Sequence, residues 1–359
     1  MSIIYFIVLI IIAFIALGLW FRSGEDLTAW DQPPDPAACD FFSRPGGASQ
    51  EHQEVARQIH AQGLELNKTP LKTRLPLMRE FMDSLAEGRQ FNTEFVPANA
   101  DGVPAEWVLA PNADATRRML YIHGGAFFAG SPKSHRTLTS RMAELTGAAV
   151  LAIDYRLMPE NKRAAGIEDC RTAYRWMLDN GPDGPAPVST VFAGGDSAGG
   201  NLVLSLLLWI RDQGLRAPNG VVALSPVVDA THSGPSIKAN LKTDLMLAPL
   251  FSKIMRMPAL FLSWYYVLET RFRPTNPVVS PLFGDLSSLP PILIHVSEAE
   301  LLLDDARRFV NKARAQGSPV RLQIWADMLH VWQIFNPEVP EAVEALDQIG
   351  SFLRSAESA

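Results

Sequence analysis

The sequence predicts an α/β protein with a mostly parallel, eight-stranded sheet flanked by helices and with a helical cap above it. Three observations predict this class. From about residue 91 onward, short runs rich in β-branched residues alternate with longer runs of helical periodicity, which is typical of parallel sheets with helices on both faces. The chain has 359 residues, 47% of them hydrophobic, so it can bury a large core. A long apolar insertion between two of the strands supplies material for a cap.

The first element is an apolar segment, Ile3 to Phe21. Its nineteen residues would extend in a helix over about 28 Å, close to the thickness of the hydrocarbon core of a bilayer. Tyr5 and Trp20 lie near its ends, where interfacial aromatic residues occur. No lysine or arginine precedes it and no A-x-A-like cleavage site follows, which favours an anchor over the alternative, a cleaved signal peptide. We expect residues 1–22 to be a single-pass membrane anchor. One flanking arginine, Arg22, leaves the side of the membrane open.

Residues 23–46 are polar and contain several prolines and glycines, which predicts a linker. If this segment is only a tether, removal of residues 1–22 should leave a soluble and active protein. The remaining residues, 47–359, are expected to fold as one domain. It begins with two amphipathic helices, over Ser49–Leu66 and Leu71–Leu85.

Strands and helices then alternate. Apolar and β-branched runs predict strands over Phe91–Val96, Val103–Leu109, Arg118–Ile122, Ala148–Ile153, Val188–Ala193, Gly220–Leu224, Ile292–Val296 and Val320–Ile324. Helical periodicity predicts helices over Thr137–Thr146, Ile167–Asp179, Gly200–Gln213, Asp304–Gln316 and Glu338–Ser355. The apolar interval from Pro226 to about Pro281 interrupts this order. It either adds core helices or forms, with the first two helices, a lid over an apolar pocket.

Charge and cysteine content exclude some classes of function. The net charge is −6, so the chain lacks the basic field of a nucleic-acid-binding protein. The two cysteines, Cys39 and Cys170, predict neither a disulfide framework nor a metal site. Cys170 lies in a helical pattern and is expected to be a small core residue.

A G-x-S-x-G motif, Gly195 to Gly199, stands between a predicted strand and a predicted helix. Glycines two residues to either side of Ser197 allow a sharp turn that holds the serine in a strained conformation. The turn also places Ser197 at a helix N-terminus, where free N–H groups favour a developing negative charge. The motif predicts that Ser197 is a nucleophile; an ordinary glycine-rich turn is the alternative.

A nucleophilic serine needs a base and an acid that orients the base. On a strand–turn–helix of this kind the order along the chain is serine, acid, histidine. Of seven histidines, His330 alone follows every candidate acid, directly after a predicted strand, whereas His295 falls inside one. The candidate acids after the strand that ends at Val296 are Glu298, Glu300, Asp304 and Asp305. The two aspartates begin a helix, where acidic residues act as caps, so position favours Glu300 and leaves Glu298 as the alternative.

Another predicted strand is followed by His123-Gly124-Gly125-Ala126-Phe127. Consecutive glycines after a strand allow backbone N–H groups to converge on one point, which an oxyanion hole requires. The N–H of Ala198 would complete it. In this interpretation His123 orients the loop and is not the base.

These motifs resemble those of the hormone-sensitive-lipase-like esterases, the bacterial family IV branch of the α/β-hydrolases. His123–Phe127 is similar to the H-G-G-G-F/W signature, and Gly195–Gly200 matches G-D-S-A-G-G in full. Asp154–Glu160 is similar to D-Y-R-L-A-P-E, and the segments Ser280–Gly284 and Leu289–Pro291 also resemble family segments. The resemblance covers roughly residues 90–355.

The resemblance implies an α/β-hydrolase fold and a Ser197, Glu300, His330 triad, because Glu300–Asp305 falls on the family's D-P-L-x-D-E pattern. It implies that Gly125, Ala126 and Ala198 donate to the oxyanion while Gly124 shapes the turn. Ala126 departs from the usual third glycine but keeps its backbone N–H. The family's cap is similar to residues 47–90 and about 235–272.

The implied activity is hydrolysis of small to medium apolar acyl esters through an acyl-enzyme, with a small-molecule ester or lactone as the partner and no metal or organic cofactor. A membrane localisation follows from the anchor, in a bacterium at the inner membrane. A lactonase or an amidase with the same triad is an alternative. Others are a hydrolase-fold binding protein without activity and a membrane-tethered receptor or scaffold.

Overall fold

Strands that are buried on both sides form the centre of the sheet. The strands β5 (Ala148–Ile153), β8 (Thr190–Asp196), β9 (Gly220–Leu224) and β10 (Ile292–Ser297) are buried along their whole length. A parallel sheet with helices on both faces buries both sides of its strands, which explains why these runs do not alternate between apolar and polar residues.

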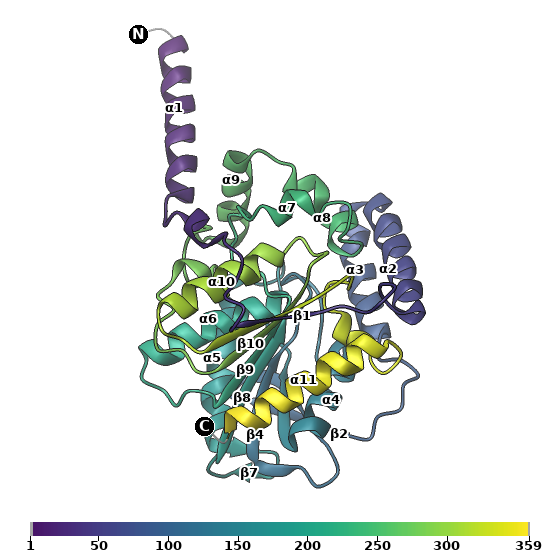
Figure 1. Cartoon of the computed structure of the whole chain (residues 1–359). Helices are drawn as coiled ribbons and strands as arrows, with labels where there is room; N and C mark the ends of the chain where they lie inside the picture. Colours follow the sequence, from purple (N-terminus) through teal and green to yellow (C-terminus); the bar gives the residue numbers. More distant parts are fainter. Residues whose placement is uncertain (1–2, 358–359) are drawn as a thin grey trace.

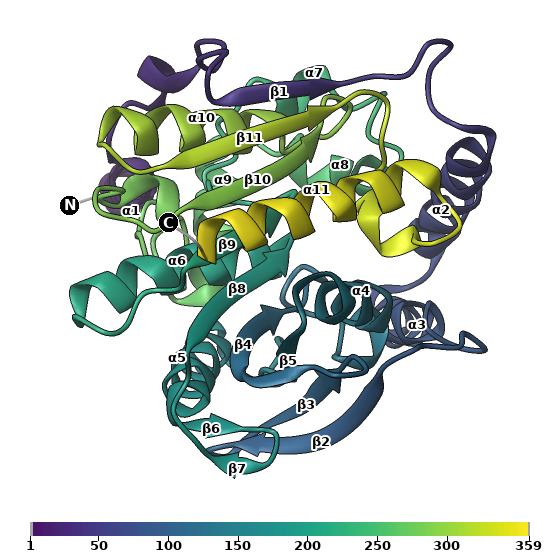
Figure 2. The same cartoon turned by 60° about the horizontal axis from the view of Figure 1, so that its bottom comes forward.

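The computed structural model describes residues 3–357 (Figure 1). The other strands of the sheet are β1 (Cys39–Phe42), β2 (Glu94–Ala100), β3 (Val103–Leu109), β4 (Asp114–Ile122) and β11 (Val320–Trp325). The sheet has nine strands in the order β1-β11-β10-β9-β8-β4-β5-β3-β2, and only β2–β3 and β3–β5 pair antiparallel (Figure 2). The short strands β6 (Asn180–Gly181) and β7 (Gly184–Pro185) pair separately. The mostly parallel sheet is therefore confirmed, but its number of strands is nine and not eight.

Helices cover both faces of the sheet. On one face, α5 (Arg163–Asp179), α6 (Ala198–Asp212) and α10 (Leu303–Ala315) pack in one core cluster, which includes Cys170. On the other face, α4 (Arg136–Thr146) and α11 (Pro340–Glu357) pack in a second cluster. The structure has all of the helices predicted between the strands, with ends shifted by a few residues.

Further helices lie together above one end of the sheet in Figure 1, where they form the cap. The first two are α2 (Gln50–Lys68) and α3 (Leu71–Ser84). The others come from the insertion between β9 and β10 and are α7 (Ser236–Ala239), α8 (Leu247–Met255) and α9 (Ala259–Thr270). Each of the two interpretations of the apolar insertion describes part of it: Leu247, Leu250 and Phe251 of α8 line a pocket, whereas Tyr266 of α9 packs against the core cluster.

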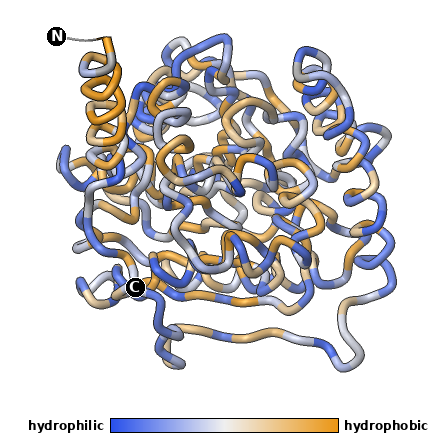
Figure 3. Tube along the Cα trace, turned by 90° about the horizontal axis from the view of Figure 1, so that it is seen from above, coloured by the Kyte–Doolittle hydropathy of each residue, from blue (hydrophilic) through white to orange (hydrophobic). Residues whose placement is uncertain are grey.

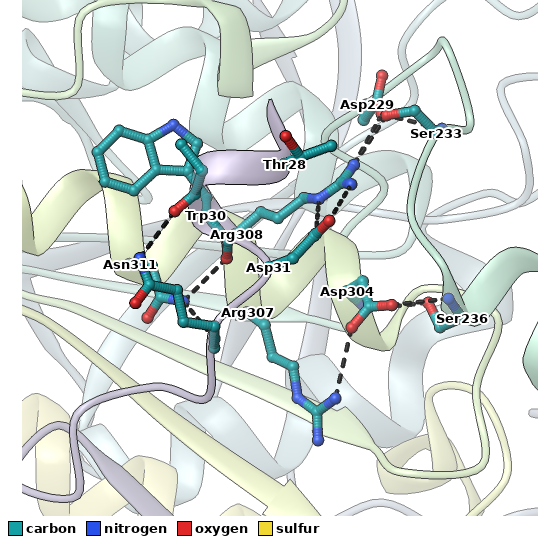
Figure 4. A network of polar contacts seen from close by, with 12 residues as sticks. Thr28, Trp30, Asp31, Asp229, Ser233, Ser236, Asp304, Arg307, Arg308 and Asn311 are labelled. Atoms are coloured by element: carbon teal, nitrogen blue, oxygen red, sulfur yellow. Dashed lines mark hydrogen bonds and ion pairs between the residues drawn. The ribbon is translucent and has the colours of Figure 1, made fainter. Parts of the chain in front are cut away.

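The predicted linker, residues 23–46, is packed against the domain. Its short helix η1 (Leu27–Trp30) lies beside α10, where the buried Arg308 donates to Asp31 at 2.6 and 3.1 Å (Figure 4). Asn311 donates to the carbonyl of Trp30 at 3.0 Å. Farther along, β1 pairs in parallel with β11 and adds the ninth strand. The polar residues of this segment, which predicted a free linker, include Asp31, whose partner Arg308 lies 277 residues later in the chain. The linker is therefore held in place by an ion pair with α10.

The N-terminal helix α1 (Ile3–Arg22) extends beyond the rest of the molecule (Figure 1). It is the one helix within residues 3–357 that is long and apolar enough to cross a membrane. Seen from above in Figure 3, it is a nearly continuous hydrophobic rod at one corner of the molecule. Its C-terminal half contacts α9 of the cap, through Phe14 and Phe21.

Candidate active site

Ser197 stands on the sharp turn between β8 and α6. Its φ of 51° and ψ of −113° are unfavourable for a residue with a side chain. The turn closes because the chain passes very near the end of β4: a Cβ on Gly199 would lie 1.9 Å from the carbonyl oxygen of Ile122. Glycine is therefore required two residues after the serine, and the turn exposes Ser197 to a pocket beneath the cap.

His330 lies in the loop after β11 and lines the same pocket as Ser197. Its Nδ1 is 2.6 Å from Oε2 of Glu300, which is itself buried in the loop after β10. The other oxygen of Glu300 accepts from the Ser225 hydroxyl at 2.8 Å and from the Ser297 amide at 2.7 Å. Nε2 of His330 is buried and has no hydrogen-bond partner among residues 3–357. One ring nitrogen is thus held by a carboxylate, and the other is free within the pocket.

The electrostatic surroundings separate His330 from the two central histidines. Burial alone would lower the pKa of His330, but the adjacent Glu300 carboxylate, with Asp244 and Asp196 farther away, outweighs it and raises this pKa above its usual value. Burial lowers the pKa of His123 and of His295 to about 3. These two imidazoles stay neutral at physiological pH and are too weakly basic to accept a proton from a serine.

Among the four candidate acids, Glu300 alone contacts a histidine in the described part of the chain. Glu298 lies at the edge of a different cavity, beside Asp327. Asp304 accepts from the amide of Ser236 at 2.6 Å. Asp305 accepts from the amides of Val228 and Asp229, and burial raises its pKa to about 8. The two aspartates therefore have structural partners, but these lie in the segment after β9, and α10 has no side-chain cap, so the expected capping role is wrong.

The loop after β4 has the conformation that its glycines allow. Gly125, Ala126 and Phe127 all have positive φ, at 111°, 56° and 68°. A Cβ on Gly125 would lie 2.1 Å from the carbonyl oxygen of Ala129. Gly125 and Ala126 line the pocket together with Ser197. Their backbone N–H groups, like that of Ala198 in the first turn of α6, have no acceptor among residues 3–357.

Asp196, which precedes the serine, positions this loop, and sequence reasoning missed its role. It is buried; its Oδ1 accepts from the Tyr121 hydroxyl at 2.9 Å and the Gly124 amide at 3.1 Å, and its Oδ2 lies 3.2 Å from Nε2 of His135. Burial would raise the pKa of Asp196, but His135 and the hydroxyl donor hold it below its usual value. Its place inside the G-D-S-A-G-G motif was the available signal.

The cap supplies most of the wall of the pocket. Its apolar lining comes from α2, α3, the segment around α8 and the loop after His330, and includes Ile59, Leu66, Met78, Phe81, Met82, Leu85, Met246, Leu247, Leu250, Phe251, Val331, Ile334 and Phe335. The polar side chains of the lining are Gln62, from α2, and a group around Ser197 on the floor that includes Asp196, His135 and His330. Within residues 3–357 there is no cluster of three or more histidine, cysteine, aspartate or glutamate side chains able to hold a metal ion.

Comparisons with known proteins agree with this architecture. Residues 119–334 match the family model described as alpha/beta hydrolase fold. The chain is 38% identical to an acetyl-hydrolase of Streptomyces hygroscopicus over 70% of this chain and 80% of that protein. It is 36% identical to an esterase of Acinetobacter venetianus over 72% of this chain and 81% of that protein.

Solved structures give the same result. An esterase from the bacterial hormone-sensitive lipase family superposes with a TM-score of 0.75 at 36% identity, covering 86% of this chain and 99% of the other. An esterase/lipase from an uncultured bacterium superposes with a TM-score of 0.74 at 35% identity, covering 87% and 100%. The chain therefore belongs to the α/β-hydrolase family, among the esterases that resemble hormone-sensitive lipase, and it is a carboxylesterase-like hydrolase.

Proposed function

We propose that this hydrolase cleaves small to medium apolar acyl esters, with Ser197 as nucleophile, His330 as general base and Glu300 as the acid that orients it. The observation that carries this proposal is the free Nε2 of His330, buried in the pocket that Ser197 lines while Nδ1 is bound to Glu300. Nε2 of His123 and of His295 is also buried without a partner among residues 3–357, but neither of these histidines lines the pocket, so the position of His330 beside the pocket supports its role as the base.

In the first half of the reaction His330 takes the proton of the Ser197 hydroxyl as its oxygen bonds to the ester carbonyl carbon. The backbone N–H groups of Gly125, Ala126 and Ala198 are placed to donate to the resulting oxyanion. The carbon–oxygen bond to the alcohol then breaks, and the alcohol leaves with the proton held on His330. The product on the enzyme is an acyl ester of Ser197.

In the second half a water molecule gives a proton to His330 and its oxygen bonds to the acyl carbon. The carboxylic acid leaves, and the proton returns to Ser197. Throughout, Glu300 keeps Nδ1 protonated and stabilises the imidazolium. Since two donors fix Glu300 itself, its carboxylate does not need to reorganise during the reaction.

The pocket supports an uncharged substrate with an apolar acyl group, because its wall is formed by aliphatic, methionine and phenylalanine side chains. The side chain at Ala126, at the position of the third glycine in the H-G-G-G-F/W signature that this loop resembles, narrows the space beside the proposed oxyanion site. This favours slender acyl groups over branched ones.

We also propose that residues 1–22 anchor the enzyme in a membrane, with the catalytic domain following the segment 23–46. The support is the length and hydropathy of α1 and the exposure of most of its side chains. An N-terminal signal sequence would show the same two properties. N-terminal sequencing of the protein recovered from washed membranes distinguishes the two.

The proposed triad is tested by replacing Ser197. Ser197→Ala should lower turnover of a short p-nitrophenyl ester by at least about 10⁴-fold without changing the melting temperature. A fluorophosphonate should add one covalent group to the wild type, at Ser197, and none to the variant. Ser205→Ala is the matched control, because Ser205 is a buried serine on the same helix without a partner among residues 3–357. Residual turnover near the wild-type level would refute the assignment.

A further inference from the structure

The apolar helix α1 is packed along the cap helix α9 and is not a free tether. Phe14 stacks on Trp264 with the ring centres 4.8 Å apart, and Nε1 of Trp264 donates to the carbonyl of Phe14 at 3.1 Å. Gly18 fits directly against α9, since a Cβ there would lie 2.2 Å from Cδ1 of Leu260. These contacts fix the orientation of the cap relative to α1.

The two helices run in the same direction, and the start of α9 lies beside the middle of α1. The ring of Phe261 is 6.0 Å from that of Phe14, whereas Arg273, just beyond α9, donates to the carbonyls of Trp20 and Ser23 at 2.7 Å. Phe14 precedes Phe21 by seven residues, or about 10 Å along a helix. The first turn of α9 therefore lies about 10 Å into the level that α1 would occupy in a bilayer.

One side of α9 is apolar and uncovered. Phe261, Tyr265 and Leu268 are 51%, 46% and 59% exposed, and their spacing of four and three residues places them on a single helix face, while Met257, 38% exposed, lies in the turn just before the helix. We call these four residues the interfacial face. Lys253, in the last turn of α8, and Arg256, in the turn after it, are exposed near the start of α9, which is the deeper end of this face, so their charges limit how far this end can enter the hydrocarbon. Glu269 is the exposed acidic residue on α9, near its far end.

The same part of the cap also forms the pocket. Leu247, Leu250 and Phe251 line the pocket from α8, and α8 continues through the turn at Arg256 into α9. The helix that contacts the acyl group of a substrate is therefore joined directly to the helix that carries the interfacial face.

We propose that the interfacial face is immersed in the membrane that α1 crosses, and that the enzyme takes its substrate, an amphiphilic lipid acyl ester, from that membrane. The substrate part of this proposal rests on the proposed esterase function. The occupant of the face is lipid because the face is continuous with α1, whose exposed apolar side chains need the same environment. An immersion of about 10 Å is within the depth reached by interfacial helices.

The immersion is tested on the full chain reconstituted in vesicles of phosphatidylcholine and phosphatidylglycerol. An environment-sensitive dye is placed on Leu268→Cys, on Met257→Cys or, as the control, on Phe41→Cys, with Cys39 replaced by serine in all three. Phe41 is 57% exposed on the edge strand β1, so it matches Leu268 in exposure. Both dyes on the interfacial face should be quenched by nitroxide lipids, the Met257 dye more by acyl-chain nitroxides. Quenching no greater than at Phe41 would overturn the proposal.

The substrate class is tested with the Phe261→Ser, Leu268→Ser double variant in the same vesicles. Hydrolysis of a long-chain acylglycerol embedded in the vesicles should fall about tenfold, while turnover of a soluble short-chain ester stays within about twofold of the wild type. An equal loss on both substrates, or on neither, would overturn the lipid substrate. If the wild type hydrolysed no ester at all, the proposed esterase function would be refuted. The dye experiment would still test the immersion of the interfacial face, because it does not depend on activity.

Discussion

At the scale of single residues, the sequence offers four carboxylates as the acid of the site, and one of them, Glu300, contacts His330. Glu300 binds Nδ1 of His330, and Glu298, two residues earlier, lies at another cavity. Glu300→Gln should therefore lower kcat/KM by about 10³–10⁴-fold, and Glu298→Gln should leave it within about twofold. Rates of both variants on a soluble ester check this, and the reverse order would assign the acid to Glu298.

The pH profile gives a second measurement of the same contact. The proposed base is neutral His330, so we expect activity to rise with pH through the pKa of this histidine, which Glu300 holds above its usual value. Replacing the carboxylate with an amide removes the negative charge that favours the imidazolium. The pKa of His330 must then fall, and the acid limb of kcat/KM should move to lower pH in Glu300→Gln. A limb that stays in place would show that Glu300 does not act on His330.

The residues of the site differ in how well sequence predicts them. Ser197 and the glycine loop are local motifs, and the order of acid and base restricts the choice of histidine to His330. The positioning roles of Asp196 and His52 are not predicted from spacing. Their partners are backbone amides, of Gly124 and Leu329, that only the fold brings near. A residue that positions a loop by one hydrogen bond has no required spacing from that loop in the chain.

At the scale of elements, the first cap helix, α2, contacts the loop that carries His330. His52, on α2, is buried, and its Nε2 accepts a hydrogen bond of 3.0 Å from the amide of Leu329, the neighbour of His330. Burial lowers the pKa of His52, which keeps the ring neutral and its Nε2 able to accept. Helix α2 also contributes Ile59 and Leu66 to the pocket wall. A movement of this helix would therefore change the pocket and the base together.

His52→Leu should lower kcat about tenfold, because it leaves the Leu329 amide buried without an acceptor, at about 1–3 kcal/mol. His52→Gln should restore much of the rate, since its amide oxygen can accept in place of Nε2. Steady-state kinetics on a soluble ester, with melting temperatures of both variants, check this. Equal losses in the two variants would indicate a packing role and contradict the positioning role.

Elements were predicted well where their pattern is local and poorly where it is not. Local runs of apolar and β-branched residues predicted eight of the strands. In contrast, β1 has only four residues, and it forms a strand because the edge of β11 is available for pairing. In the same way, η1 is fixed by Arg308 and Lys312 of α10, which pair with Asp31 and Glu25. Sequence alone shows the charges of this segment but not their partners.

At the scale of the whole molecule, α1, the cap and the segment 23–46 form one connected unit. Arg22, at the end of α1, donates to the carbonyl of Thr231 at 3.2 Å and to the hydroxyl of Ser263 at 3.4 Å. The chain then follows α10 and enters the sheet as β1. The tether expected from composition would allow the domain to move freely relative to α1, whereas this arrangement holds the cap in one orientation relative to α1.

Removal of residues 1–22 tests this unit and revises the expectation of a simple soluble enzyme. The truncation uncovers Leu260 and Trp264 beside the interfacial face and so enlarges an apolar surface that water does not tolerate in a monomer. The catalytic residues lose no contact, so a soluble ester should still be hydrolysed in mild detergent. Without detergent the truncated chain should self-associate at micromolar concentration, as light scattering measures. The same truncation carrying Leu260→Ser, Phe261→Ser and Leu268→Ser should stay monomeric. If the truncated chain were monomeric without these changes, the packing of α1 on α9 would not be needed to shield an apolar surface from water.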